Sequence, residues 1–206
     1  MPVEIDLHVH TKFSGDCVIS PKIIVEQLHS HPRIRGIAIT DHDTMSGFHY
    51  VRKLAAPYQD LIIIPGIEVT TQQGHLIILG IQREPKRLMT IWEAVDFGIE
   101  QGGVIVIPHP YRQSGIADIA REVYAHAIEV LNPRVTREAN NQASELAKIR
   151  GLAPVGGSDC HHVDEMWAVC TEIDAEPSID EILNAIKMGR TKPHRLDSTI
   201  LRNSYI

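Results

Sequence analysis

Short apolar runs rich in isoleucine and valine alternate with segments of helical periodicity along most of this 206-residue chain. Seven such runs are expected as strands, at residues 3–8, 36–40, 61–69, 75–81, 104–107, 127–131 and 153–156. Continuous hydrophobic strands that alternate with helices are typical of parallel strands buried on both faces. The pattern therefore predicts an α/β fold in which about seven units form a closed or nearly closed barrel, a distorted (β/α)7 arrangement. An open doubly wound sheet is the alternative, but it usually has a glycine-rich phosphate loop after its first strand, and none follows here.

Residues that favour helix ends mark the helices between these runs. Ser20-Pro21 supplies an N-cap and a first-turn proline for the first helix. Ser178 and Glu181 have the spacing of a capping box that opens the last helix, which is expected to stop near Gly189. Further helices are expected over residues 45–58, 88–101 and 136–150.

One part of the chain departs from simple alternation. Pro65-Gly66 interrupts the third run, and the fourth run opens at His75 after a short turn at residues 72–74, with no helix between the two runs. Strands joined by a tight turn are antiparallel neighbours. We therefore expect His75 to open a strand that is antiparallel to the third run or that begins at the same rim.

Length and composition limit the classes of function. A chain of this length with 43% hydrophobic residues can bury a sizeable core, and residues 1–206 are expected to form one domain. Lys and Arg total 20 against 26 Asp and Glu, with no basic run, so a long nucleic acid is not expected as a partner. No apolar stretch is long enough to span a bilayer, and there is no room for a signal peptide before the first strand. Three cysteines without a Cys-x-x-Cys pair are expected to be reduced thiols, which favours a cytoplasmic location.

Histidine, aspartate and glutamate gather at the ends of the apolar runs. His8 and His10 end the first run, and because side chains alternate along a strand, the two imidazoles should point the same way. The other groups at run ends are Asp16 in the loop after the first run, His42 within Asp41-His42-Asp43, Glu68, His75, His109, and Asp159 and His161 within Ser158-Asp159-Cys160-His161. Barrel active sites are built at the carboxyl ends of the strands, so these groups should share one rim.

Nine imidazole and carboxylate groups on one rim predict a metal centre. Desolvating several carboxylates without cations would be very costly. The number of groups fits two or three divalent ions that share one bridging carboxylate. Nitrogen and oxygen ligands without thiolate suit Zn, Mn or Fe.

The order of these motifs resembles that of the PHP (polymerase and histidinol phosphatase) family. The similarity covers residues 5 to about 195 and rests on Asp6-Leu7-His8-Val9-His10-Thr11, Thr40-Asp41-His42-Asp43, Pro65-Gly66-Ile67-Glu68, Pro108-His109-Pro110 and Gly157-Ser158-Asp159-Cys160-His161. Members that resemble this chain are distorted seven-stranded barrels whose trinuclear metal centre hydrolyses phosphoesters. The resemblance implies three metal sites, formed by His8, His10, Glu68 and Asp159, by Asp16, His42 and His161, and by Glu68, His75 and His109.

The function expected from the resemblance is a metal-dependent phosphoesterase. Two metals would share a bridging water and lower its pKa to roughly 7, and the resulting hydroxide would attack phosphorus. The expected substrate is a small phosphorylated metabolite, a nucleotide or a short oligonucleotide. The expected catalytic residues are Asp16, Glu68, Asp159 and Arg112, and the expected substrate-binding residues are Arg112, Arg134 and His162. A guanidinium suits the second role because its donors match two phosphate oxygens.

Two other classes of function stay open. An amidohydrolase-type C–N hydrolase also starts from a His-x-His strand, but such barrels usually need a longer chain and a lysine that bridges the metals. No lysine ends a strand here, and Glu68 occupies the bridging role instead. The second alternative is a metal-binding regulatory module without turnover, against which the complete ligand set argues.

Overall fold

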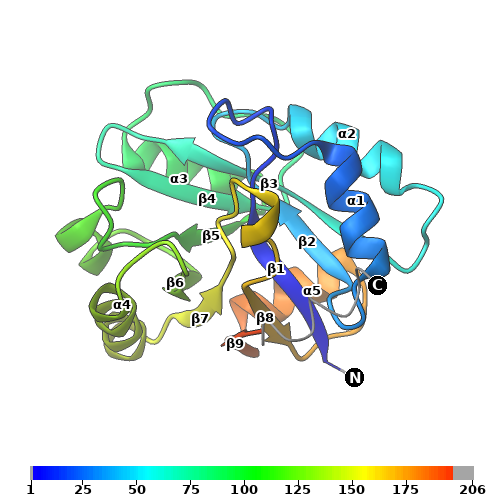
Figure 1. Ribbon diagram of the computed structural model, residues 1–206. Helices are drawn as coiled ribbons and strands as arrows, with labels where there is room; N and C mark the ends of the chain where they lie inside the picture. The colour runs from blue at the N-terminus through cyan, green and yellow to red at the C-terminus, as the bar shows by residue number, and fades with distance from the viewer. Residues whose placement is uncertain (1, 197–206) are drawn as a thin grey trace.

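A nine-stranded sheet that curls into a nearly closed barrel forms the centre of the computed structural model, which describes residues 2–196 (Figure 1). The strands are β1 (Val3–Val9), β2 (Gly36–Ile39), β3 (Ile62–Thr70), β4 (His75–Leu79), β5 (Val104–Ile107), β6 (Ala127–Leu131), β7 (Ala153–Gly156), β8 (Val169–Ile173) and β9 (Thr191–Arg195). The helices are α1 (Pro21–Ser30), α2 (Ser46–Ala55), α3 (Ile91–Glu100), α4 (Arg137–Arg150) and α5 (Ile179–Lys187), with short 3-10 helices η1 (Ala117–Arg121) and η2 (Val163–Glu165). Neighbouring strands follow the order β7-β6-β5-β4-β3-β2-β1-β8-β9. The predicted distorted β/α barrel is confirmed.

The direction of each strand determines which of its two ends lies at the rim. The strands β1, β2 and β3 are mutually parallel, as are β5, β6 and β7. Between these two groups lies β4, which pairs antiparallel with β3 and with β5. All six parallel strands therefore present their carboxyl ends at one rim, where β4 presents its first residue, His75. The expectation that His75 opens an antiparallel strand is confirmed.

The predicted interruption at Pro65-Gly66 is wrong, because β3 continues through both residues. Residues 62–65 of β3 pair in parallel with β2, and residues 66–70 pair antiparallel with β4. Proline has no N–H to donate to a ladder. Pro65-Gly66 is therefore the point at which β3 changes its main pairing partner, and the strand carries on to place Glu68 at the rim.

The strands β8 and β9 are an addition to the predicted set. Their segments contain threonine, cysteine, lysine, proline and arginine and lack the continuous apolar pattern of the other strands. The strand β8 pairs antiparallel with β1, and β9 pairs antiparallel with β8. Hydrogen bonds of threonine side chains link this pair of strands to β7, from Thr191 Oγ1 to Pro154 O at 2.8 Å and from Gly156 N to Thr171 Oγ1 at 2.9 Å. The strands β8 and β9 therefore fill the gap between β1 and β7.

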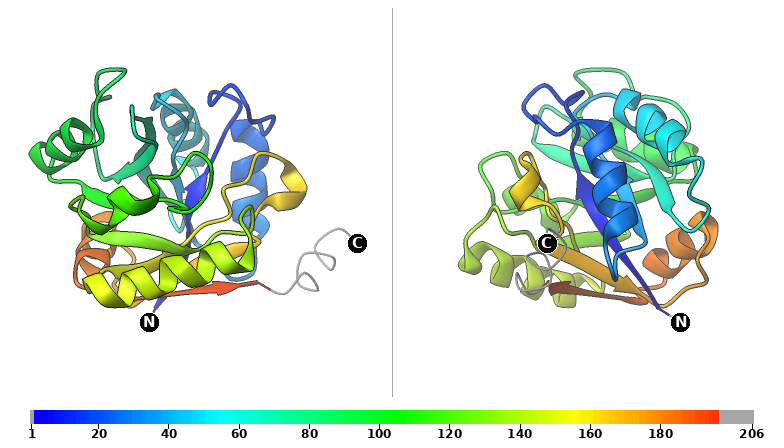
Figure 2. Two further views of the ribbon diagram at one scale, coloured as in Figure 1. Left: turned by 90° about the vertical axis from the view of Figure 1, so that its left-hand side faces the viewer. Right: turned by 45° about the vertical axis from the view of Figure 1, so that its right-hand side comes forward.

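Two apolar clusters hold the layers together. The outer cluster joins α1 to α4 to the outside of the sheet, and the inner cluster joins the inward faces of the strands to α5 through Ile182 and Ile186 (Figures 1 and 2). Ile5 of β1 belongs to the inner cluster and Val9 to the outer one. A bulge in the pairing of β1 with β2 between Asp6 and Val9 accounts for this switch, since a bulge changes the face to which later residues point.

The predicted helix ends are confirmed at several positions. The hydroxyls of Ser20 and Ser178 accept hydrogen bonds from backbone N–H groups in the first turns of α1 and α5. Gly151 after α4 and Gly189 after α5 have φ of 65° and 72°, a region that favours glycine. Within residues 2–196, no helix is long and apolar enough to cross a bilayer.

Candidate metal centre

All nine predicted ligands meet in one cluster at the rim, with Glu68 at its centre. The Oε1 atom of Glu68 lies 2.8 Å from His75 Nδ1 and 3.1 Å from His109 Nε2. Its Oε2 atom lies 3.2 Å from the Nε2 atoms of both His8 and His10. Glu68 is 1% exposed, so these four imidazoles from β1, β4 and the end of β5 surround a carboxylate that has almost no contact with solvent.

The other two carboxylates lie beside this centre. Asp159 Oδ1 is 3.5 Å from His10 Nε2 and 3.6 Å from His161 Nδ1. Asp16 Oδ2 is 3.0 Å from His161 Nε2 and 3.5 Å from His42 Nε2. The imidazole of His161 therefore connects the two carboxylates.

The donor set fits divalent cations. Ligand atoms lie within 4.8 Å of one another in each of four groups of this cluster, which are His8, His10 and Asp159, then His10, His42 and His161, then His42, Glu68 and His75, then His8, His109 and Glu129. Imidazole and carboxylate donors in groups of three or four are the usual ligands of Zn, Mn and Fe. The Nε2 atoms of His8 and His10 face each other at 3.0 Å, a spacing that suits two lone pairs directed at one cation. The residues present thus fit a multinuclear centre.

Within residues 2–196, three of the six non-glycine residues with positive φ belong to or adjoin the predicted ligands. His109 and Asp159 have φ of 25° and 50°, and Asp43, next to His42, has φ of 54°. Residues other than glycine adopt this region at a cost and persist there only where the surroundings fix them, most often at functional sites. For Asp43 the surroundings are β3, because its Oδ1 accepts from Thr70 N at 2.8 Å.

Burial and mutual attraction shift the pKa values of the clustered groups. Burial would raise the pKa of Glu68, but the charge of His8 and hydrogen bonds from neighbouring imidazoles outweigh it and hold this pKa well below its usual range. Burial would also raise the pKa of Asp159, but the charge of His8 and a hydrogen bond from His10 outweigh it and hold this pKa below its usual range. The pKa of His10 is raised to about 9, since hydrogen bonds to Asp159 and Glu68 outweigh its desolvation. Without a cation, protonated imidazoles therefore balance the carboxylates.

The loop after β1 is held in place by a buried carboxylate that is not a predicted ligand. Asp41 accepts hydrogen bonds from Thr11 N at 2.6 Å and from Thr11 Oγ1 at 2.8 Å. Ser14 in the same loop lies 2.9 Å from His10 Nδ1 through its Oγ, which also accepts from His42 N at 3.0 Å. Ser14 therefore orients the imidazole of His10 and fixes the backbone at His42.

The predicted substrate-binding residues lie at the edge of the cluster in different settings. Arg112 donates from Nη1 to Asp159 Oδ2 at 2.8 Å and is about one third exposed. Arg134 forms an ion pair with Glu165 at 2.8 Å, and this carboxylate also accepts from the backbone N–H groups of His161 and His162. Arg112 thus contacts a predicted ligand directly, whereas Arg134 is engaged with the loop that carries His161.

Two residues of the β6 region complete the cluster and were not predicted from the sequence. Glu129 lies 3.1 Å from His8 Nδ1 through Oε1, and Asn132 donates to both Glu129 and Asp159. The available signal was a single charged residue inside the apolar run 127–131, which becomes informative only when the barrel sets β6 against β1.

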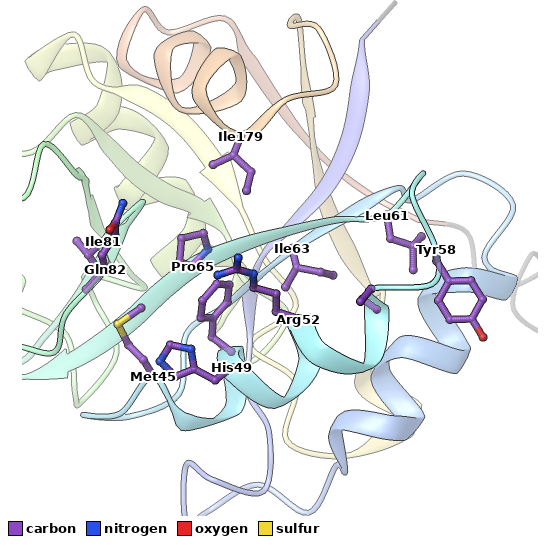
Figure 3. Close-up of a pocket in the computed structure, with 13 residues that line it drawn as sticks. Met45, His49, Arg52, Tyr58, Leu61, Ile63, Pro65, Ile81, Gln82 and Ile179 are labelled. Carbon is purple, nitrogen blue, oxygen red and sulfur yellow. The ribbon is translucent and has the colours of Figure 1, made fainter.

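Two other features of the described residues lie away from this centre. Glu4, Cys170 and His194 place potential ligand atoms together, but the Arg33 guanidinium already pairs with Glu4 and lies 3.4 Å from His194 Nε2. A cavity of about 650 Å³ lies between α2, β3 and the start of α5, and none of the nine ligands lines it (Figure 3). Neither feature belongs to the metal centre.

Comparison with known proteins assigns the family. Residues 137–191 match the family described as PHP-associated. The uncharacterised protein MJ0417 of Methanocaldococcus jannaschii is 30% identical over 220 aligned positions, which cover 98% of this chain and 87% of that protein. A second uncharacterised protein of the same organism, MJ1587, is 30% identical over 139 positions, which cover 62% of this chain and 80% of that protein. The chain belongs to the PHP-domain family.

Three solved structures share the fold. PsfC from Pseudomonas syringae has a TM-score of 0.68 at 16% identity, covering 98% of this chain and 96% of its own. An amidohydrolase from Chromobacterium violaceum with bound sulfate has a TM-score of 0.65 at 17% identity, covering 97% and 95%. A proposed metal-dependent phosphoesterase from Bifidobacterium adolescentis has a TM-score of 0.62 at 18% identity, covering 77% and 87%. These identities are low, and the similarity establishes the fold.

Proposed function

We propose that this protein is a metal-dependent hydrolase of phosphoester bonds that acts on a small phosphorylated metabolite or a nucleotide. The observation that carries the proposal is the complete cluster of six imidazoles and three carboxylates at the rim, built around Glu68. The family assignment and the description of the relative from Bifidobacterium adolescentis support it.

The exposure of the ligands indicates where a substrate would enter. Asp16, His42 and His75 have side chains that are 51%, 20% and 17% exposed, whereas Glu68 is 1% exposed. A phosphate group would therefore approach over the loop after β1 and the start of β4. When bound, divalent ions supply water of lowered pKa and neutralise charge on the phosphate oxygens.

The chain's own residues would position the cations and the substrate and would exclude bulk water from the site. Together with the imidazoles, the three carboxylates would hold the cations, and the burial of most of these groups would keep bulk water out. Arg112 has its guanidinium beside Asp159 and partly open to solvent, so it can present donors to a phosphate oxygen while keeping Asp159 in place. The pKa of Asp16 is lowered by His161 and His42 despite partial burial, so Asp16 is a carboxylate at neutral pH and acts as a ligand or base, not as an acid.

A C–N hydrolase is the second candidate, because the relative from Chromobacterium violaceum is an amidohydrolase. Within residues 2–196, no ion pair or hydrogen bond joins a lysine to the cluster, and this disfavours the lysine-bridged form of that chemistry.

The test compares substrates on stripped and reloaded protein. Protein stripped of metal should lose hydrolysis of p-nitrophenyl phosphate or bis-p-nitrophenyl phosphate, and Mn or Zn should restore it. Asp16→Asn should lower the restored rate by at least 100-fold, whereas Asp118→Asn on the surface should not change it. Activity that survives chelation, or faster turnover of an N-acyl amino acid than of either phosphoester, would contradict the proposal.

A further inference from the structure

Glu129 is the one charged residue of β6, and its carboxylate is 2% exposed. Its Oε1 atom lies 3.1 Å from His8 Nδ1, and its Oε2 atom accepts from His109 N at 2.9 Å and from Asn132 Nδ2 at 2.9 Å. A buried carboxylate is costly unless its lone pairs are satisfied. Here three donors satisfy it, and two of them belong to predicted metal ligands.

The contact with His8 determines which ring nitrogen is available. A hydrogen bond from Nδ1–H to a carboxylate leaves the Nε2 lone pair free for a metal and raises the basicity of the ring. His8 Nε2 points into the cluster, 3.0 Å from His10 Nε2 and 3.2 Å from Glu68 Oε2. Glu129 thus holds the imidazole from the side opposite to the cations.

Asn132 extends the same support to a second carboxylate. Its Nδ2 donates to Glu129 Oε2 at 2.9 Å and to Asp159 Oδ2 at 3.1 Å. Asn140 of α4 fixes the backbone of Asn132 through hydrogen bonds at 3.0 Å and 2.9 Å, so the amide has little freedom to turn. The network therefore links α4 and β6 to the predicted ligand Asp159, which follows β7.

We infer that Glu129 is a positioning residue that, together with Asn132, orients His8, His109 and Asp159 for metal binding. The inference rests on the proposed metal-dependent function. It assigns a role to β6, the one parallel strand from which no ligand is expected. Because Oε1 faces Nδ1 of His8, Glu129 acts through the imidazole and not as a ligand of its own.

The test measures metal binding and not turnover. Dissociation constants for Mn²⁺ are determined on stripped protein by competition with a chelating dye, for the wild type, Glu129→Gln, the surface control Glu145→Gln and the core control Ile128→Val. Glu129→Gln should bind Mn²⁺ about 10- to 100-fold more weakly while keeping the same number of sites, because partners behind metal ligands contribute that much to affinity. Both controls should stay within threefold of the wild type, although Ile128→Val lowers the unfolding temperature.

A spectroscopic signature separates positioning from a general loss of stability. In Zn-loaded protein labelled with ¹⁵N-histidine, the Nδ1 proton of His8 should move upfield in Glu129→Gln and stay in place in Ile128→Val. If Glu129→Gln does not fold, Asn132→Ala tests the positioning role in its place, and the same loss of Mn²⁺ affinity is expected.

Unchanged affinity in Glu129→Gln would overturn the inference, and so would the loss of a whole equivalent of metal, which would make Glu129 a ligand. Wild-type protein that binds Mn²⁺ but hydrolyses no phosphoester would refute the proposed function and leave this inference standing.

Discussion

Replacing Glu68 by glutamine should empty the first and third predicted metal sites and leave the second, formed by Asp16, His42 and His161, occupied. Within residues 2–196, Glu68 is the only carboxylate whose two oxygens face imidazoles of both the first and the third predicted groups, namely His8 and His10 through Oε2, and His75 and His109 through Oε1. Its Oε2 atom also lies 3.4 Å from Nδ1 of His42, which belongs to the second group. The second group has its own carboxylate in Asp16. Glutamine has nearly the same shape, so the change removes charge and leaves the packing of β3 intact.

The size of the effect follows from the distances. Two unit charges 3.2 Å apart, the separation of Glu68 Oε2 from His10 Nε2, attract by about 5 kcal/mol at an effective dielectric constant of about 20. A divalent ion carries twice the charge of an imidazolium, so the loss of attraction is at least as large. Relief of the desolvation of Glu68 offsets part of it. We therefore expect affinity to fall by at least about 100-fold at each of the two sites, since about 1.4 kcal/mol corresponds to a factor of ten.

The assay is metal content at fixed free metal. Wild type, Glu68→Gln and the surface control Glu100→Gln are equilibrated with buffered free Mn²⁺, and bound metal is counted by mass spectrometry of the digested protein. Glu68→Gln should retain one equivalent at most. A variant that folds and binds the wild-type number of ions with affinity within threefold would refute the assignment of Glu68 as the shared ligand.

Three further outcomes are expected. Gly157→Ala would place a Cβ 2.3 Å from the Cβ of His8 and 2.7 Å from its backbone N. The free energy of unfolding should therefore fall by about 1–3 kcal/mol and metal affinity should drop. An unchanged unfolding temperature would contradict the contact. Burial raises the pKa of Asp6 from 3.8 to about 7 in the folded state, so this residue makes stability fall as pH rises from about 4 to 7, by on the order of 4 kcal/mol. Asp6→Asn should lack that slope in denaturant titrations of metal-free protein, and a difference from wild type that does not vary with pH would speak against it. The pKa of His10, raised to about 9 by Asp159 and Glu68 against its desolvation, means that metal must displace a proton at neutral pH. Affinity should therefore rise with pH between 6 and 9, and calorimetry in buffers of different ionisation enthalpy should detect the released proton; binding that is independent of pH would exclude this.

Much of the fold, and the gathering of the nine predicted ligands at one rim, could be predicted from the sequence for a shared physical reason. A parallel strand buried on both faces must be apolar along its length, so a polar residue at its end stands out. His8, His42 and Asp159 each stand at such an end, and the structure brings them to one rim. The antiparallel direction of β4 could also be predicted from the sequence, because no crossover helix fits between residues 70 and 75.

The remaining features depend on closure of the barrel, which no local pattern encodes. The strands β8 and β9 are stabilised by pairing with β1 and by side-chain bonds to β7, so they need no apolar run of their own. Glu129 and His8 are 121 positions apart, and only the curvature of the sheet sets them face to face. The continuity of β3 through Pro65-Gly66 likewise depends on having different partners on its two sides.

The polar rim and the apolar interior of this barrel depend on each other. The inner cluster and α5 occupy the lower part of the barrel, so the charged groups have no solvent beneath them and must balance one another. Between β1 and β7 the rim is closed by a bond from Asp159 N to His8 O at 2.8 Å and by an isolated pairing of Val9 with Cys160, and both ligands belong to the same cluster. Since the ligands themselves span this junction, cations bound there would join β1 to β7 at the rim. The strain at His109 and Asp159 is therefore tolerated where the surrounding hydrogen bonds, and metal when present, hold the backbone in place.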